Sequence, residues 1–442
     1  MGQKTGSIKL LISIIIALLI VGGSWFLTSK SPPDRNTMKY VTSSESLVTE
    51  SIDDDSSNSD NKTTTALQTT ANNKTTVAGK TTTNKATTVV TTTKAPSTTQ
   101  TKSLPVLNHY NLSSAQKTVF YDLYNAISNG TSNIPINASI SSEDLKEVYY
   151  IAKNLNYYSV NAPLSFTYKY YSQSGVITSV SLEFPFSKEE GNRKTSALKN
   201  KVNAIKAGIP KGSDFDKIKY IHDYIINNCR YNTNAVNNTE AYPSAFTAYG
   251  ALVEGSAVCE GYSKAFSLLC SEVGIDALLV TGKGNGQPHM WNMVKSNGQW
   301  YQMDVTWDDA TVGGQDALHY SYFNITTQQI SQDHVIEDSF LVIPNATATA
   351  DNYFVYNNLL ANSYEEAKSI VAAEAKKALS TGRVIRFKAA NQSVYNEIYS
   401  NMLCNNGDIF DILTRSVGSE NIGSVSSSSK GSTTGYEISI SF

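Results

Sequence analysis

Cys259, His289 and Asp304 are residues whose types and order in this sequence could support covalent catalysis. A thiolate can attack an acyl carbon, an imidazole can move the proton, and a carboxylate can orient the imidazole. They lie within a stretch, 250–309, that also holds three of the four tryptophans. This combination predicts a thiol enzyme that forms an acyl-enzyme, provided that the fold brings the three side chains together.

The sequence around Cys259 indicates that this residue begins a helix. Small residues at 255–257 precede it, apolar residues continue to Val273, and Gly274 can cap the C-terminal end. Free backbone N–H groups and the positive end of the helix dipole in a first turn favour a thiolate over a thiol. The N–H of Cys259 is a candidate oxyanion donor, together with a second donor that spacing does not identify.

His289 and Asp304 flank Asn297-Gly298, a dipeptide that strongly indicates a two-residue hairpin turn. Counting outward from this turn places Trp291 opposite Asp304. His289 then becomes a diagonal neighbour of Asp304 on the same face, about 7 Å away along the backbone. A slip of one residue in the register would separate them. The hairpin therefore predicts a hydrogen bond between the imidazole and the carboxylate.

Three sequence blocks resemble the transglutaminase-like superfamily, which is related to papain-like thiol enzymes. In family order they read GSAVCEGYSKAF, HMWNMV and WYQMDVTWDD, within a matching region of about 215–325. The resemblance implies that the catalytic Cys, His and Asp of the family correspond to Cys259, His289 and Asp304. The flanking parts resemble membrane-anchored or secreted bacterial members. Because no triad position is substituted, the resemblance implies an active enzyme.

Two aromatic residues are candidates for the neighbourhood of the nucleophile. The resemblance suggests Tyr231 as the aromatic that precedes the nucleophile helix and donates to the oxyanion. Trp291, Trp300 and Trp307 can fill the core, although a tryptophan beside the nucleophile can also line an acyl-substrate groove. We expect Trp300 in the core and Trp291 in the groove.

The other histidines, acids and cysteines have simpler interpretations. His222 interrupts a helix face of isoleucines and is expected to be a satisfied core residue. Asp308 and Asp309 are typical of a solvated run or a turn, and they are too few for a calcium site. Three histidines lack a readable partner and are expected on the surface or in loops: His109, His319 and His334. Three cysteines are expected as free thiols: Cys229, Cys270 and Cys404.

Composition excludes several classes of function. The chain has 442 residues with 36 Lys+Arg and 38 Asp+Glu, and a net charge of -2 gives no support to nucleic-acid binding. Its four cysteines form no C-x-x-C pair, which argues against zinc ribbons, thioredoxin-like motifs and disulfide-dense scaffolds. The predicted chemistry requires no cofactor and no metal.

The N-terminal segment, 1–30, is expected to anchor the chain in a membrane. Residues 10–27 carry no charge and are long enough to span a bilayer. Lys4 and Lys9 precede them, which favours a cytoplasmic N-terminus and an extracellular C-terminal part. Cleavage of this segment is the alternative, and it would make the protein secreted.

Residues 31–103 are expected to form a disordered spacer. They contain 21 Thr and a single aromatic residue, Tyr40, so they cannot build a core. Function is therefore expected within 104–442.

We expect an α+β protein whose core is papain-like or transglutaminase-like, with the nucleophile helix packed on an antiparallel sheet and α+β regions on either side. The predicted helices follow Ser113 and Ser141 and span 214–228 and 364–379. The predicted domains are an α+β lead-in at 104–212, a catalytic domain at 213–345 and a supporting α+β region at 346–442.

The sequence thus predicts an extracellular, membrane-tethered acyltransferase or amide hydrolase that acts on protein or peptide substrates. A cysteine peptidase at the cell surface and a catalytically silent surface binding module remain alternatives. The sequence leaves the oligomeric state open, and it does not choose between an amine and water as the acyl acceptor.

Overall fold

The computed structural model describes residues 47–53, 105, 107–136, 138–171, 174–236, 238–312, 315–338, 340–404 and 407–442. No helix among these residues combines the length and the apolar character needed to cross a membrane. The predicted anchor at 10–27 lies outside the described residues, as does most of the predicted spacer. Leu47–Asp53, which lie within the spacer, form strand β1. All described residues belong to one compact unit of the chain.

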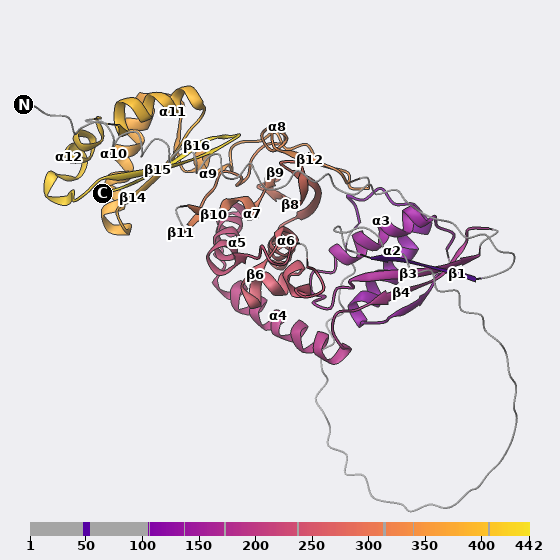
Figure 1. The fold of residues 1–442 in the computed structure, drawn as a ribbon. Coiled ribbons are helices and arrows are strands. Elements are labelled where there is room, and N and C mark those ends of the chain that lie inside the picture. The colour runs from indigo at the N-terminus through magenta and orange to yellow at the C-terminus, as the bar shows by residue number, and fades with distance from the viewer. Residues whose placement is uncertain are drawn as a thin grey trace, which may run out of the picture. The chain divides into compact units, whose positions relative to one another are not determined.

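The lead-in region forms a sheet in the order β1–β3–β4–β2, covered by two helices (Figure 1). The strands that join β1 are β2 (Asn133–Pro135), β3 (Ser165–Tyr171) and β4 (Ile177–Glu183). The helices of this region are α2 (Ser114–Asn129), α3 (Ser142–Asn154) and α4 (Lys188–Gly208). Ser113 begins α2 with a capping box to Gln116, as its sequence favours. The helices predicted to follow Ser113 and Ser141 are confirmed as α2 and α3, whereas α4 has no counterpart in the prediction.

The predicted catalytic region consists of two helices and an antiparallel sheet in the order β12–β7–β8–β9. The helices are α5 (Asp214–Asn228) and α6 (Cys259–Glu272). The strands are β7 (Ala277–Gly284), β8 (Gln287–Ser296), β9 (Gln299–Met303) and β12 (His334–Ile336). The buried Asn292 side chain joins β8 to α6 by donating to Ser263 O and Ser267 Oγ. The α+β class and a helix on an antiparallel sheet are confirmed.

The hairpin between β8 and β9 has the predicted register. Asn297 and Gly298 both have positive φ, 48° and 83°, as a tight two-residue turn requires. Asn292 pairs with Met303 and Ser296 with Gln299. The strand ends at Met303, so Asp304 follows the last pair of the ladder and begins a helical turn instead.

Short elements connect these parts. They are β5 (Arg230–Tyr231), η2 (Pro243–Phe246), η3 (Gly250–Glu254), β6 (Ser256–Ala257), α7 (Val305–Asp308), β10 (Asp309–Val312), β11 (Gln315–Leu318), α8 (Thr327–Ile330) and α9 (Tyr353–Tyr356).

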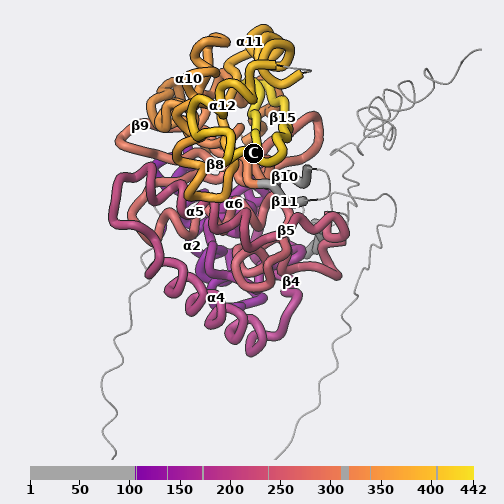
Figure 2. Tube along the Cα trace, turned by 90° about the vertical axis from the view of Figure 1, so that its left-hand side faces the viewer, coloured from indigo at the N-terminus to yellow at the C-terminus, as the bar shows by residue number. Residues whose placement is uncertain are grey.

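The C-terminal region forms a third four-stranded sheet, in the order β13–β14–β16–β15, with helices gathered around it (Figures 1 and 2). The strands are β13 (Leu360–Ala361), β14 (Val384–Ala389), β15 (Ser426–Ser432) and β16 (Gly435–Ser441). The helical elements are α10 (Tyr364–Thr381), α11 (Gln392–Ile398), η4 (Tyr399–Leu403), α12 (Ile409–Val417) and η5 (Ser419–Asn421). The helix predicted at 364–379 is confirmed as α10, and η4 continues α11 as a π-helical turn.

Two apolar cores cover the two faces of β8. Trp291 and Met293 belong to the core that contains the lead-in helices and their sheet. Val294 belongs to the other core, which contains α5, α6 and the C-terminal sheet. The central sheet is therefore buried on both sides, with only the ends of its strands free to form a site.

Candidate active site

Cys259 is the first residue of α6, as predicted. Val258 precedes it in an extended conformation and provides no side-chain cap, so the first N–H groups of the helix remain available. Glycine at 261 lets a neighbouring loop approach this turn, since a Cβ there would lie 2.4 Å from the carbonyl oxygen of Ala245. All four cysteines are free thiols, and Cys259 is partly exposed. The sulfur thus lies at the positive end of α6 with access to solvent.

His289 lies on β8 and connects the other two predicted residues. Its Nε2 is 2.7 Å from Asp304 Oδ2, and the Cys259 sulfur interacts electrostatically with the same ring. Because Nε2 faces the carboxylate, Nδ1 is the nitrogen left for the sulfur. Burial alone would lower the pKa of His289, but the charge of Asp304, the hydrogen bond to it and the Cys259 sulfur together raise that pKa to about 10. The imidazolium form is therefore favoured at neutral pH.

Asp304 is fully buried and accepts hydrogen bonds at both oxygens. Oδ1 caps α7 by accepting from the backbone N–H groups of Thr306, at 2.9 Å, and Trp307, at 3.1 Å. Oδ2 faces Nε2 of His289 and also Nε2 of His334, at 3.1 Å. Burial opposes the charged form, yet the two imidazoles hold the pKa of Asp304 below its usual range. The carboxylate is thus rigidly placed and ionised.

His334 is a residue of the site that the sequence prediction missed. The prediction placed it on the surface or in a loop, but it lies on β12 with 2% of its surface exposed. Its Nδ1 is 2.5 Å from Asp333 Oδ1, and its other nitrogen faces Asp304. Pairing of β12 with β7 brings it there. No local spacing signals a partner 30 residues away, so only the sheet topology reveals this contact.

The prediction for Trp291 is wrong. Trp291 has no exposed surface, and its Nε1 donates to Gln302 Oε1 at 2.9 Å, so it lines no groove. Trp307 is only partly buried and lies beside the His289 imidazole, with ring centroids 5.4 Å apart. Glycine at 284 leaves space for both rings, since a Cβ there would lie 2.8 Å from Trp307 Cζ2 and 3.2 Å from His289 Cδ2. Trp300, expected in the core, is partly buried against it.

Tyr231 lies on β5, beside the segment that leads into the nucleophile helix. It pairs in parallel with Ala257 on β6 and keeps 42% of its surface exposed. Burial, followed by the charges of Cys259 and Asp304, raises the pKa of its hydroxyl, so the hydroxyl remains a donor at neutral pH. A role as oxyanion donor stays a prediction.

A second histidine lies between two carboxylates next to the site. His222 is fully buried on α5, as expected of a core residue, with Nδ1 3.0 Å from Asp223 Oδ1 and Nε2 3.2 Å from Asp308 Oδ2. The expectation that Asp308 is solvated is wrong, because this residue has no exposed surface and accepts from the N–H of Tyr322. His319 is also buried, with Nδ1 3.2 Å from Glu437 Oε1. His222 thus anchors α7, which Asp304 caps.

This arrangement predicts that the protein loses stability as the pH rises. Burial lowers the pKa of His222, but Asp223 and Asp308 more than offset it and raise the pKa from 6.5 to about 9. The charged His222 ring adds its full contribution to the free energy of unfolding below pH 6.5. As the pH passes about 9 the ring loses its proton, and the free energy of unfolding falls by an amount on the order of 3 kcal/mol. Urea unfolding at pH 6 and pH 9.5 should therefore show a smaller decrease for His222→Gln than for the wild type. Equal decreases in both proteins would contradict the prediction.

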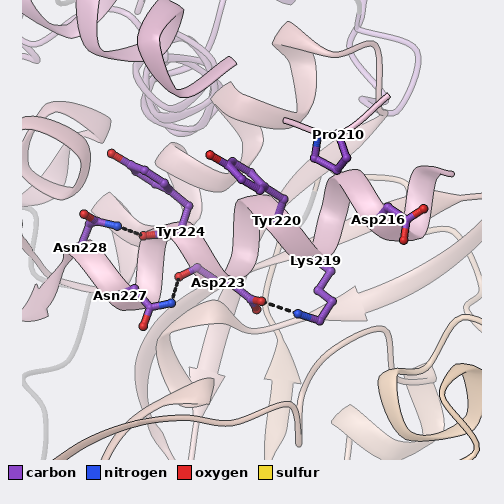
Figure 3. A pocket seen from close by; sticks show the side chains of 8 residues that line it. All are labelled: Pro210, Asp216, Lys219, Tyr220, Asp223, Tyr224, Asn227 and Asn228. Carbon is purple, nitrogen blue, oxygen red and sulfur yellow. Dashed lines mark hydrogen bonds and ion pairs between the residues drawn. The ribbon is translucent and has the colours of Figure 1, made fainter. Parts of the chain in front are cut away.

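Two other features of the described residues are not separate sites. Ligand atoms of His289, Asp304 and His334 lie within 4.8 Å of one another, but both imidazoles are hydrogen-bonded to the carboxylate, which accounts for the spacing. A shallow pocket lies on α5, where Tyr220 and Tyr224 project to one side and polar residues to the other (Figure 3). The amide groups of Asn227 and Asn228 donate to helix carbonyls, so they are already satisfied.

Parts of this chain are similar to known proteins. The model of the transglutaminase-like superfamily matches residues 203–305. Kyphoscoliosis peptidase of Mus musculus is 26% identical over 144 residues, which cover 29% of this chain and 21% of that protein. The chain thus spans about a fifth of the length of this curated relative. A crystal structure of a TGase aligns over 44% of this chain and 55% of its own, with 18% identity and a TM-score of 0.26.

The family match includes Cys259, His289 and Asp304 and ends before His334 and the C-terminal region. Residues 203–305 therefore match the transglutaminase-like superfamily, and this match is to a domain within the chain.

Proposed function

We propose that this chain is an extracellular, membrane-tethered thiol acyltransferase or amide hydrolase that acts on protein or peptide amides. The observation that carries the proposal is that His289 lies 2.7 Å from buried Asp304, while the Cys259 sulfur interacts with the same ring. The tethered location is proposed from the uncharged segment 10–27 and the lysines before it.

In the proposed acylation step, the Cys259 thiolate adds to the carbonyl carbon of a glutamine side chain or a peptide bond. The N–H of Cys259 donates to the oxyanion, and Tyr231 is the proposed second donor. His289 then gives its proton to the departing nitrogen, the C–N bond breaks, and a thioester on Cys259 remains. Asp304 keeps the ring in place and stabilises its imidazolium form.

In the deacylation step, an amine or water attacks the thioester, and His289 accepts the proton of the attacking group. The C–S bond breaks and the thiolate is restored. An amine yields a new amide bond, which is transamidation, whereas water yields hydrolysis. A cysteine peptidase follows the same reaction steps, with a peptide bond as the acyl donor and water as the acyl acceptor. The acyl acceptor therefore distinguishes transamidation from hydrolysis.

Selective alkylation tests the proposal without a substrate. The full chain is treated with limiting haloacetamide from pH 4 to pH 9, and the modified cysteine is located by peptide mass. Cys259 should react fastest, including at acidic pH where ordinary thiols are protonated. Cys229 and Cys270 should stay unmodified, because burial raises the pKa of Cys229 to about 11 and that of Cys270 well above its ordinary value.

His289→Ala is the matched variant, since it removes the imidazole and leaves the thiol. The acidic-pH reactivity of Cys259 should then disappear. Reaction of Cys259 no faster than that of the partly exposed Cys404 would refute the enzyme and favour a surface binding module.

A further inference from the structure

His334 has a carboxylate at each of its two ring nitrogens. Nδ1 is 2.5 Å from Asp333 Oδ1 and Nε2 is 3.1 Å from Asp304 Oδ2. An ionised carboxylate only accepts hydrogen bonds, so each nitrogen that faces one must carry a proton. A ring with two N–H groups is an imidazolium. The contacts alone therefore define His334 as a cation, provided that both acids are ionised.

Both acids have the surroundings of an ionised carboxylate. Asp304 accepts two backbone N–H groups at Oδ1, in addition to its contacts with the two imidazoles at Oδ2. Asp333 Oδ2 accepts from the hydroxyl of Tyr322, at 2.7 Å, and from Oγ1 of Thr433, at 3.0 Å. Thr433 lies in the turn between β15 and β16, so the C-terminal region contributes directly to this cluster.

We propose that His334 is a positioning residue that stays protonated, fixes Asp304 and offsets part of its charge, so that His289 remains acidic enough to protonate the leaving nitrogen. This inference rests on the proposed function. Two imidazoles share one carboxylate oxygen, and a fixed cation beside that oxygen weakens its attraction for the proton on the other ring. Without the cation, His289 would hold its proton more tightly and release it less readily.

The charged and titratable groups around His334 come from several elements. His289 on β8 has its ring centroid 5.4 Å away, and the uncharged Trp307 ring on α7 lies at 4.3 Å. Lys430 on β15 donates to Trp307 O at 2.9 Å, and its charge interacts with Asp304. The other titratable neighbours are Asp304, Asp333 and Tyr322. His334 is hydrogen-bonded to both carboxylates, those of Asp304 and Asp333.

Nuclear magnetic resonance of the full chain with ¹⁵N-labelled histidine tests the charge directly, because the sequence has only 5 His. His334→Gln identifies the His334 signals by their loss. We expect both His334 nitrogens to be protonated at pH 7. A neutral ring at pH 7 would overturn the proposal whether or not the protein is an enzyme.

The same variant tests the effect on the catalytic ring. His334→Gln retains an amide donor near Asp304 but removes the charge, so the titration midpoint of His289 should rise by roughly one pH unit, a tenfold change in proton affinity. A purely structural role of His334 would lower activity without this rise. An unchanged or lowered midpoint would overturn the proposal.

Asp333→Asn provides a second test if His334→Gln fails to fold. It removes one of the two carboxylates that keep the His334 nitrogens protonated. The titration midpoint of His334 should therefore fall by at least roughly one pH unit. No change in that midpoint would overturn the assigned charge. Alkylation of Cys259 in each sample separates the proposed function from the charge assigned to His334. If Cys259 is inert while the histidine titration midpoints are as expected, only the proposed function is refuted.

Discussion

Cys259→Ala should abolish both amine incorporation and amide hydrolysis, with a loss of about 10⁴-fold or more in turnover. The loss is expected to be this large because the thioester cannot form without the sulfur. No other thiol can substitute, since Cys229 and Cys270 are buried and Cys404 lies in the C-terminal region. The measurement is incorporation of a fluorescent primary amine into a glutamine-containing protein, together with release of ammonia or new amino termini.

Cys404→Ala is the matched control for Cys259→Ala, because it removes a partly exposed thiol outside the site. It should keep wild-type turnover. Intact-mass analysis should also detect a substrate-derived acyl group on the wild type and on the control but not on Cys259→Ala. Turnover of Cys259→Ala above a tenth of the wild-type rate would exclude the thiol mechanism.

Asp304→Asn should lower turnover by about 10⁴-fold, as loss of the orienting carboxylate does in other triads. Asp304 accepts from two backbone N–H groups and faces two imidazoles. An asparagine has one oxygen, so its NH₂ group must face some of these donors, and the His289 ring loses its fixed orientation.

Asp304→Asn should also shift the pH profile. Burial lowers the pKa of His289, and Asp304 is the main group that opposes burial, so this variant should bring the pKa down from about 10. The basic limb of the rate profile should then move to lower pH, opposite to the shift expected for His334→Gln. Asp351→Asn is the matched control. Asp351 is also a buried carboxylate, but it accepts hydrogen bonds from Ser296 and Asn297 at the far end of the hairpin. It should leave the basic limb in place, and an equal shift in both variants would contradict the assigned role.

Much of the site could be predicted because its signals are local. The Asn297-Gly298 turn has the two positive φ angles that the dipeptide favours, and this fixed the register that brings His289 to Asp304. The start of α6 at Cys259 was likewise predictable from the small residues before it and the helical spacing after it. In both cases a few neighbouring residues determine the backbone.

The wrong predictions concern contacts between distant segments. Trp291 was expected in a groove because a tryptophan beside the nucleophile can line one, but here the lead-in region packs over this side chain. Asp308 looked solvated in sequence, yet its partner His222 is 86 residues away. His334 reaches Asp304 only because β12 joins the edge of the sheet. Spacing along the chain carries no information about such partners.

The contact of Thr433 with Asp333 has a consequence for how the site is assembled during synthesis. Cys259, His289 and Asp304 are made in that order, and the turn between β15 and β16 that holds Asp333 is made after all three. Domains fold as their residues leave the ribosome, N-terminal parts first. The hydrogen bonds to Asp333, which faces His334, are therefore complete only after this turn leaves the ribosome, and a nascent chain that lacks the turn has the thiol, imidazole and carboxylate without this support.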